Sequence, residues 1–244
     1  MIKQRAYLLH SRPYKETSAL VDFFTPDYGH IRCMARGVKK ANKYQQPLQP
    51  FTLYTIFFHG DSGLKNLDKF EIFSLPLNLS GNPLFSGFYI NEVLLRALRS
   101  DAEVESQSLF DAYEDVLASL NSEGLELSLR LFELSLLEHM GQQYEWALDF
   151  RTESMVDDNA FYGFFVEQGM ARVSQKYANS NPNAVFRGNE LKALSHGELL
   201  DQNVLKMCKR LFRLALRPII GYKPIQAREL LKQFQQLDAI NNNR

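Results

Sequence analysis

Cysteine is scarce in this sequence, which has only Cys33 and Cys208 among its 244 residues. Two distant cysteines give neither a disulfide framework nor the close Cys pairs of a structural zinc site. Long apolar runs are also missing, because no stretch approaches the roughly 18 residues that span a bilayer. The first residues lack the apolar core of a signal peptide. These absences predict a soluble protein of a reducing cytoplasm, without a membrane partner.

The sequence also lacks the short motifs that carry common enzyme chemistry. It has no Gly-rich phosphate loop, no dinucleotide-binding Gly pattern, no His-Glu-x-x-His zinc motif and no Gly-x-Ser-x-Gly nucleophile elbow. Its five histidines show no spacing typical of metal ligands. Acidic residues between positions 101 and 167 leave paired carboxylates open, but no pair stands out. We therefore predict a protein that is not an enzyme and holds no cofactor or metal.

Charge is distributed unevenly, although the formal net charge is zero. Residues 1–80 contain 11 Lys and Arg against 6 Asp and Glu, residues 81–203 contain 8 against 20, and residues 204–244 contain 9 against 2. Two basic ends therefore flank an acidic middle. This segregation predicts either a polyanionic partner for the ends or an internal contact in which the ends neutralise the middle.

Alternating apolar and polar residues over positions 1–80 predict a series of short β-strands. The expected strands are Arg5–His10, Ser18–Thr25, His30–Arg36, Phe51–Phe58 and Lys65–Phe73. Turns that contain Gly29 and Gly63 join the second strand to the third and the fourth to the fifth. Five short strands with a longer connection between the third and the fourth favour an OB-fold, a small five-stranded barrel.

Two loops of this barrel combine cations with aromatic side chains. Such a mixture is typical of surfaces that hold the phosphates and the bases of single-stranded nucleic acid. A solvated loop is the simpler interpretation of either loop alone, but two of them on one small barrel favour a DNA surface. The predicted DNA-binding residues are Arg12, Tyr14, Lys15, Arg36, Lys39, Lys40, Lys43 and Tyr44.

From residue 81 onward, apolar residues mostly recur at helical spacing. We expect helices that begin near Asn82, Leu109, Glu123, Asn203 and Ile225. Residues 144–190 lose this period and predict an irregular segment, with a small β-hairpin over 164–174 and a loop over 179–183. The sequence therefore predicts an α+β protein, with an OB-fold domain over residues 1–80 and a mainly helical domain over residues 81–244.

The helix expected from Asn203 to Arg217, ended by Pro218, has the clearest amphipathic pattern. Apolar residues occupy one side, and the opposite side carries cations without any acid. We call these cations the cationic ridge: Lys206, Lys209, Arg210, Arg213 and Arg217. An ordinary solvated helix face is one explanation. The absence of acids favours an anionic partner, which could be DNA, an acidic peptide or the acidic middle of this chain.

Several short segments, in this order along the chain, resemble the RecO family of bacterial recombination mediators. In the barrel region they are LHSRPYKETS at 9–18, DFFTPDYG at 22–29, ARG at 35–37, LQPFT at 48–52 and LKNL at 64–67. In the helical region they are SGFYINEVL at 86–94, LALRP at 214–218, GYKP at 221–224 and AREL at 227–230. The resemblance covers nearly the whole chain.

The resemblance implies an OB-fold joined to a helical domain, binding of single- and double-stranded DNA, and annealing of complementary strands. It also implies contacts with the mediator RecR and with the acidic C-terminal tail of single-stranded DNA-binding protein, so that RecA can load onto DNA. The expected location is the bacterial cytoplasm, on the nucleoid during repair. The alternative is a non-enzymatic OB-fold adaptor that binds RNA or a protein in another machine.

Two details of the resemblance concern particular residues. Many members hold zinc between Cys pairs after the third helix, but residues 144–175 contain no Cys here, so we predict no zinc. Arg130 matches an Arg of the family's tail-binding region, and together with the cationic ridge it forms the predicted tail site. Alternatively, Arg130 pairs within its own helix with Glu126 or Glu133.

Overall fold

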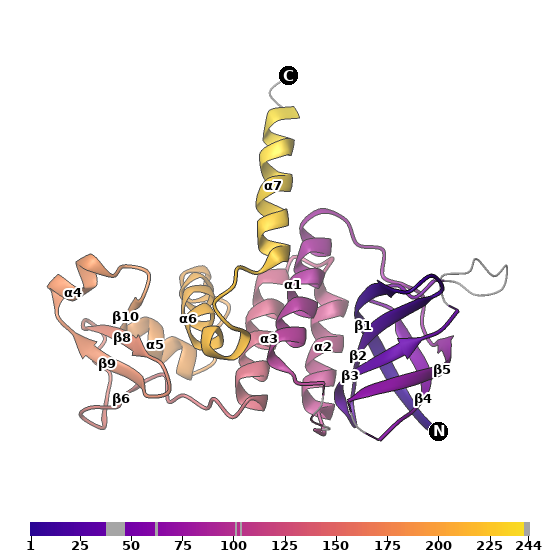
Figure 1. Cartoon of the computed structure of the whole chain (residues 1–244). Coiled ribbons are helices and arrows are strands. Elements are labelled where there is room, and N and C mark those ends of the chain that lie inside the picture. Colours follow the sequence, from indigo (N-terminus) through magenta and orange to yellow (C-terminus); the bar gives the residue numbers. More distant parts are fainter. Residues whose placement is uncertain (38–46, 62, 101, 103, 242–244) are drawn as a thin grey trace. The chain divides into compact units, whose positions relative to one another are not determined.

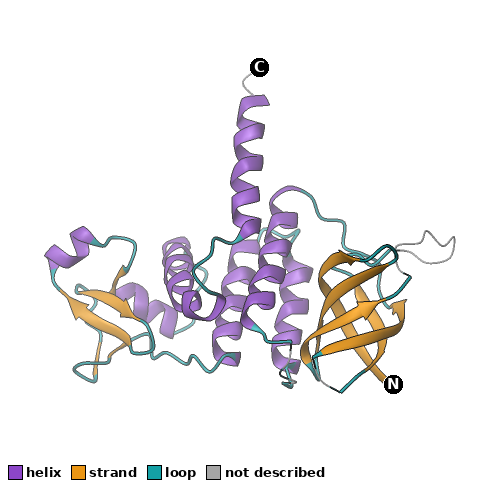
Figure 2. Ribbon diagram, in the orientation of Figure 1, coloured by secondary structure: helices purple, strands orange, loops and turns teal. Residues whose placement is uncertain are grey.

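The computed structural model describes residues 1–37, 47–61, 63–100, 102 and 104–241. The chain divides into two compact units, one of residues 1–122 and 223–244 and the other of residues 123–222, which we call unit 1 and unit 2. Unit 1 contains a barrel and helices, and unit 2 contains helices and a small sheet (Figures 1 and 2). The predicted α+β class is therefore confirmed.

Unit 1 begins with the five predicted strands, which close into a barrel in the order β1-β2-β3-β5-β4. The strands are β1 (Ile2–Tyr14), β2 (Ser18–Thr25), β3 (Gly29–Ala35), β4 (Leu53–His59) and β5 (Leu64–Ile72). Only β3 and β5 pair in parallel. β1 is longer than predicted because its first half pairs with β4 and its second half pairs with β2. This arrangement confirms the OB-fold.

Period-two alternation fills the barrel with apolar side chains. Val21 and Phe23 on β2, and Ile31 and Cys33 on β3, are almost fully buried in the barrel core. Gly29 opens β3 with a φ of 60°, the positive φ that the predicted β2–β3 turn requires.

Three helices complete unit 1: α1 (Gly81–Ala97), α2 (Gln107–Ser119) and α7 (Gln226–Asn241). Tyr7 of β1 packs against Phe110 and Tyr113 of α2, with ring centroids 5.6 and 5.1 Å apart. Phe24 of β2 contacts the same two rings. Helices α1 and α2 therefore belong to the same unit as the barrel, although they follow residue 80.

Two side chains of α1 bind the N-terminal end of helix α7, among the contacts that join the two helices. The carboxylate of Glu92 accepts hydrogen bonds from the backbone N–H groups of Gln226 and Ala227, both at 3.0 Å. Arg96 donates to the backbone carbonyls of residues 223 and 224, both at 2.7 Å, and also pairs with Glu92. We call Glu92 and Arg96 the α7 clamp. A carboxylate at a helix N-terminus satisfies N–H groups that have no partner within the helix.

Unit 2 contains four helices and five short strands among the described residues. In chain order they are α3 (Leu125–His139), β6 (Leu148–Asp149), β7 (Ser154–Met155), β8 (Phe161–Phe165), β9 (Gly169–Val173), α4 (Gln175–Ser180), β10 (Val185–Arg187), α5 (Gly188–Ser195) and α6 (Gln202–Ile220). The predicted hairpin is confirmed as β8 and β9, but it forms part of a five-stranded sheet. The loop predicted over 179–183 begins too early, because Asn179 and Ser180 close helix α4.

Helix α6 passes Pro218, where we predicted its end, and continues to Ile220. A proline in the last turn removes only one backbone hydrogen bond, so the helix can continue for two residues. It ends at Gly221, whose φ of 82° is unfavourable for other residues. No helix in the described part of the chain has the length and the apolarity that crossing a membrane requires.

Candidate nucleic-acid interface

The outward-pointing side chains of β2 are buried at one end of the strand and more exposed at the other. Phe24 lies under helix α2, whereas Leu20 and Ser18 at the other end are half-buried. Strand pairing places Arg12 of β1 and Met34 of β3 on either side of Leu20. We call this open surface the barrel face, and its outward-pointing residues are His10, Arg12, Tyr14, Ser18, Leu20, Asp22, Arg32 and Met34.

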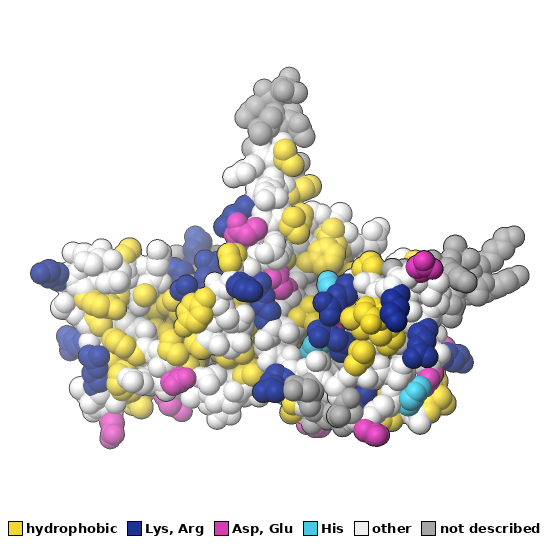
Figure 3. Space-filling model, in the orientation of Figure 1, with side chains coloured by type: hydrophobic (Ala, Val, Ile, Leu, Met, Phe, Trp, Pro, Cys, Tyr) yellow, Lys and Arg dark blue, Asp and Glu magenta, His cyan; other side chains and the backbone are white. Residues whose placement is uncertain are grey.

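Cations surround an apolar centre on the barrel. In the view of Figure 3, Lys and Arg side chains gather around apolar side chains over the strands. On the barrel face, Leu20 and Met34 form the half-buried middle, and Arg12 and Arg32 flank them. Tyr14 adds an aromatic ring that is 39% exposed, enough for a base to stack on it.

The structure brings the described part of the predicted DNA surface to one end of this face. Arg12 and Tyr14 are exposed on β1, and Lys15 follows in the turn with a φ of 54°. Arg36 follows β3 directly and is exposed. It lies near the turn that connects β1 to β2, because Ala35 at the end of β3 pairs with Ala19 near the start of β2. The other four predicted residues, Lys39, Lys40, Lys43 and Tyr44, lie outside the described residues.

Sequence reasoning missed His10 and Arg32, which complete the basic rim of the barrel face. Both lie within predicted strands and outside the two loop clusters of cations and aromatic side chains. The available signal was alternation: His10, Arg12 and Tyr14 are two residues apart on β1, as are Arg32, Met34 and Arg36 at β3. An outward series of cations and aromatics on neighbouring strands predicts one shared surface.

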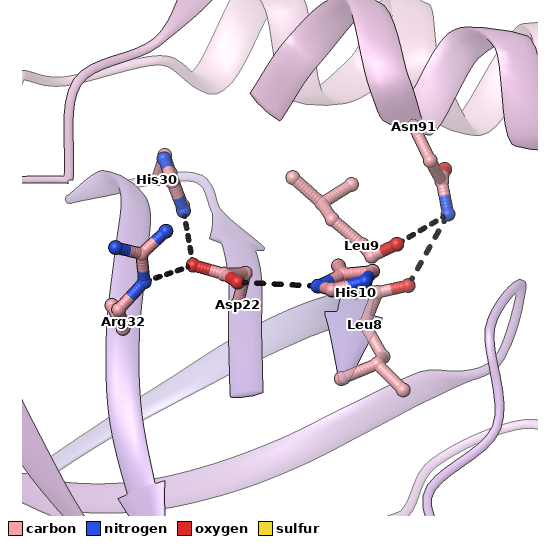
Figure 4. A network of polar contacts seen from close by, with 7 residues as sticks. All are labelled: Leu8, Leu9, His10, Asp22, His30, Arg32 and Asn91. Atoms are coloured by element: carbon pink, nitrogen blue, oxygen red, sulfur yellow. Dashed lines mark hydrogen bonds and ion pairs between the residues drawn. The ribbon is translucent and has the colours of Figure 1, made fainter. Parts of the chain in front are cut away.

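Asp22 is the only acid in the barrel face, and it is buried (Figure 4). Its Oδ1 accepts hydrogen bonds from Nε2 of His30 at 2.9 Å and from Nε of Arg32 at 2.7 Å. Nδ1 of His10 lies 3.7 Å from the other carboxylate oxygen. Burial alone would raise the pKa of Asp22, but the hydrogen bonds from His30 and Arg32 prevail and lower it. Asp22 is therefore an anion at neutral pH.

His30 links this carboxylate to the end of helix α1. Its Nδ1 lies 3.0 Å from the backbone carbonyl oxygen of Leu98, which can only accept a hydrogen bond. Its Nε2 faces the ionised Asp22, which can also only accept. Both ring nitrogens therefore face an acceptor, and the buried His30 ring is held between the two.

A β-bulge in β1 makes a second link between the barrel and the helices. The pairing of β1 with β2 shifts between Leu8 and His10. The amide of Asn91 on α1 donates to the backbone carbonyls of Leu8 and Leu9, at 3.4 and 3.2 Å (Figure 4). The hydroxyl of Tyr113 donates to the Asn91 amide oxygen at 2.7 Å. These bonds fix the backbone of β1 just before His10, the first residue of the barrel face on this strand.

The described residues contain no group of three or more His, Cys, Asp or Glu side chains placed to hold a metal ion. On the barrel face, cations can neutralise phosphates, while Tyr14, Leu20 and Met34 offer apolar contact to bases.

The cationic ridge forms on helix α6 in unit 2 as predicted, but several of its residues have internal partners. Lys209 pairs with Glu126 of α3 at 3.2 Å. Arg210 donates to the backbone carbonyl of residue 182 at 2.7 Å, and Arg217 lies 4.7 Å from the ring centroid of Tyr222. Lys206 and Arg213 are exposed. The internal contact with an acid of the middle segment, which the charge distribution left open, is therefore present at Lys209.

Arg130 lies inside unit 2, where only 2% of it is exposed. Its Nη2 contacts Glu133 at 3.0 Å, and its Nη1 lies 3.5 Å from Glu126. This is the internal pairing that the helical spacing allowed. Burial of Glu133 favours it, because a buried carboxylate needs a cationic partner.

A hollow of about 280 Å³ opens beside Arg210 in unit 2. Two arginines on its wall each cover a phenylalanine ring: Arg187 covers Phe161 at 4.9 Å, and Arg210 covers Phe186 at 5.2 Å. The hollow therefore combines apolar side chains with two cations, and Gln175, Asn179 and the acid Glu190 also line it.

Comparison with known proteins identifies relatives along most of the chain. Residues 1–76 match the family model "Recombination protein O N terminal", and residues 80–196 match "Recombination protein O C terminal". The chain is 38% identical over 233 residues to a DNA repair protein RecO of Enterobacter sp. (strain 638), covering 95% of this chain and 97% of that protein. RecO proteins of Klebsiella pneumoniae (strain 342) and Escherichia coli O9:H4 (strain HS) are also 38% identical, with 93% and 94% of their lengths covered.

Proposed function

Because the chain belongs to the RecO family of DNA repair proteins, we propose that it is a non-catalytic recombination mediator whose barrel face binds DNA. The family indicates a role in DNA repair and recombination. In this proposal the protein binds single- and double-stranded DNA and anneals complementary strands. RecR would be the partner that helps it load RecA.

The observation that carries the proposal is the barrel face. It sets the basic side chains of His10, Arg12 and Arg32 around an apolar centre, and Arg36 lies at one end of the face. Cations around apolar and aromatic contacts suit a single strand, because the phosphates are neutralised while the bases stack. The predicted residues Lys39, Lys40 and Lys43 follow closely after Arg36 in the sequence but lie outside the described residues.

We further propose that unit 2 binds the acidic tail of single-stranded DNA-binding protein. The hollow between Arg187 and Arg210 supports this proposal, since arginines suit the carboxylates of such a tail and the phenylalanines suit an apolar end. Arg210 belongs to the cationic ridge, whose exposed Lys206 and Arg213 would attract the acids that precede the tail's end. Arg130 is buried and would act by supporting α3, without touching the peptide.

The test of DNA binding is a titration of labelled single-stranded DNA at several salt concentrations. Each phosphate neutralised contributes about 0.7 to the log–log salt slope, so replacing Arg12 and Arg36 by Gln should lower the slope by about 1.4. The control replaces Lys3 and Lys69, which flank Phe57 on the β1–β4–β5 side of the barrel. If both double variants lose affinity equally, the barrel face is not the DNA surface.

Annealing distinguishes a mediator from an adaptor in another machine. Complementary strands coated with single-stranded DNA-binding protein should anneal faster with the wild-type protein, and the Arg12→Gln/Arg36→Gln variant should lose most of this acceleration. An RNA competitor that displaces DNA at equal or lower concentration, without annealing of the DNA, would favour the adaptor.

The tail site is tested with an acidic peptide that ends in a hydrophobic residue. Arg210→Ala should weaken peptide binding at least several-fold and leave binding of naked DNA unchanged. Lys192→Gln is the control, because Lys192 already pairs with Asp158 at 2.6 Å and does not line the hollow. Loss of DNA binding alone in Arg210→Ala would assign the ridge to DNA.

A further inference from the structure

We propose that Arg32 binds a DNA phosphate through its terminal amino groups and that Asp22 is the residue that positions it. This inference rests on the proposed function of the barrel face and names a phosphate-binding residue and its support within it.

Arg32 is bound at one end of its guanidinium and open at the other. Its Nε donates to Oδ1 of Asp22 at 2.7 Å. This hydrogen-bonded ion pair with Asp22 is the contact that the guanidinium makes among the described residues. The Arg32 side chain remains 37% exposed. A guanidinium held through Nε leaves its two terminal amino groups free for the fork that matches two phosphate oxygens.

Asp22 is itself held from the buried side of the barrel. Nε2 of the His30 ring lies 2.9 Å from the same Oδ1 atom, and the ring is fixed in turn by the carbonyl of Leu98. The Asp22 carboxylate is 3% exposed, and His10 lies beside its second oxygen (Figure 4). The chain of contacts from α1 through His30 and Asp22 to Arg32 runs from a rigid interior to the open face. A donor that is already oriented loses little conformational freedom when it binds.

A carboxylate such as Asp22 is otherwise unexpected in a surface that binds DNA. A surface that binds a polyanion is weakened by a negative charge, so electrostatics alone predicts that removing Asp22 improves DNA binding. Positioning predicts the opposite, because Arg32 would lose the contact that orients it. The two explanations therefore differ in the sign of one measured effect.

The experiment measures affinity and salt slope for labelled single-stranded DNA with the full-length protein. Arg32→Gln should weaken binding about 5- to 10-fold and lower the slope by about 0.7, the share of one phosphate. Lys3→Gln removes one exposed cation from β1 outside the barrel face and should change affinity less than about twofold with an unchanged slope.

Two further variants separate positioning from charge. Asp22→Ala should weaken binding about threefold or more although it removes an anion, and thermal unfolding monitors whether the variant folds. Arg32→Lys keeps the charge and replaces a partly exposed side chain, but it has no Nε and no fork, so binding should weaken about threefold or more.

The inference is overturned if Asp22→Ala binds DNA more tightly than wild type, or if Arg32→Lys binds as wild type does. It is also overturned if Arg32→Gln behaves like Lys3→Gln. A wild-type protein that fails to bind single-stranded DNA would instead remove the proposed function, and this inference with it.

Discussion

The α7 clamp permits a quantitative prediction for the change Glu92→Gln. Glu92 uses both carboxylate oxygens to accept the first two N–H groups of α7, at Gln226 and Ala227. The side chain is 18% exposed, so water replaces these contacts poorly. A glutamine keeps one acceptor oxygen, but its amide nitrogen faces an N–H group that then has no acceptor.

The magnitude follows from these contacts. A hydrogen bond to a charged group contributes about 1.5–3 kcal/mol, and the charge at a helix N-terminus contributes about 0.3–1 kcal/mol more. Losing one bond and the charge should therefore destabilise unit 1 by about 2–4 kcal/mol. For a protein of this size, each kcal/mol shifts Tm by about 2–4 °C. The variant should melt about 4–16 °C lower.

Thermal and urea unfolding measure this loss, and hydrogen exchange localises it to the amides of α7. The matched control is Glu229→Gln in the first turn of the same helix, where an exposed pair with Lys232 contributes about 0–1 kcal/mol. If Glu92→Gln unfolds within about 0.5 kcal/mol of wild type, or no more easily than the control, the clamp does not hold α7.

Three other outcomes follow from buried groups and from chain order. Burial raises the pKa of the Cys33 and Cys208 thiols to about 12. A thiol reagent at pH 8 should therefore leave both cysteines unmodified in the native protein and modify both in urea. Rapid modification of the native protein would contradict their burial. Because the pKa of Asp22 is lowered by folding, its contribution to stability is present above the unfolded value of about 3.9 and disappears as the pH falls through the lower folded value. Asp22→Asn should thus cost more stability at pH 7 than in strong acid, and an equal loss at both pH values in urea unfolding would refute this. Truncation to residues 1–222 should lower the melting temperature of unit 1 and spare the exchange protection of the unit 2 sheet, whereas equal loss in both units would contradict the division of the chain.

Much of the barrel could be predicted because its signals are local. Alternation and turn glycines placed all five strands, with errors of a few residues at their ends. The error in β1 has a physical reason, since its second half extends beyond the barrel core and is exposed on both sides from His10 onward. Exposed residues give no apolar alternation, and pairing with β2 decides the strand there.

The functional surface was only partly predictable because it depends on contacts between distant residues. The cations around Arg12 and Arg36 could be found as clusters in sequence. The row that joins Asp22, His30 and Arg32 forms only when strands pair, and its attachment to Leu98 requires a helix end 68 residues from His30. Arg130 shows the converse case: its spacing to Glu133 allowed an internal pair, but burial decides that the pair forms.

The division of the chain has a consequence for how the protein emerges from the ribosome. Unit 2 lies in sequence between α2 and α7, so about 130 residues are synthesised between the end of α1 at Ala97 and the start of α7 at Gln226. At about 5–20 residues per second, this interval lasts roughly 6–26 s. During that time Glu92 lacks the N–H groups of α7, Arg96 lacks the carbonyls of residues 223 and 224, and the α1 surface that α7 covers is exposed. Unit 2 can therefore finish folding before unit 1, and the nascent barrel and its helices await the last 22 residues of the chain, 223–244.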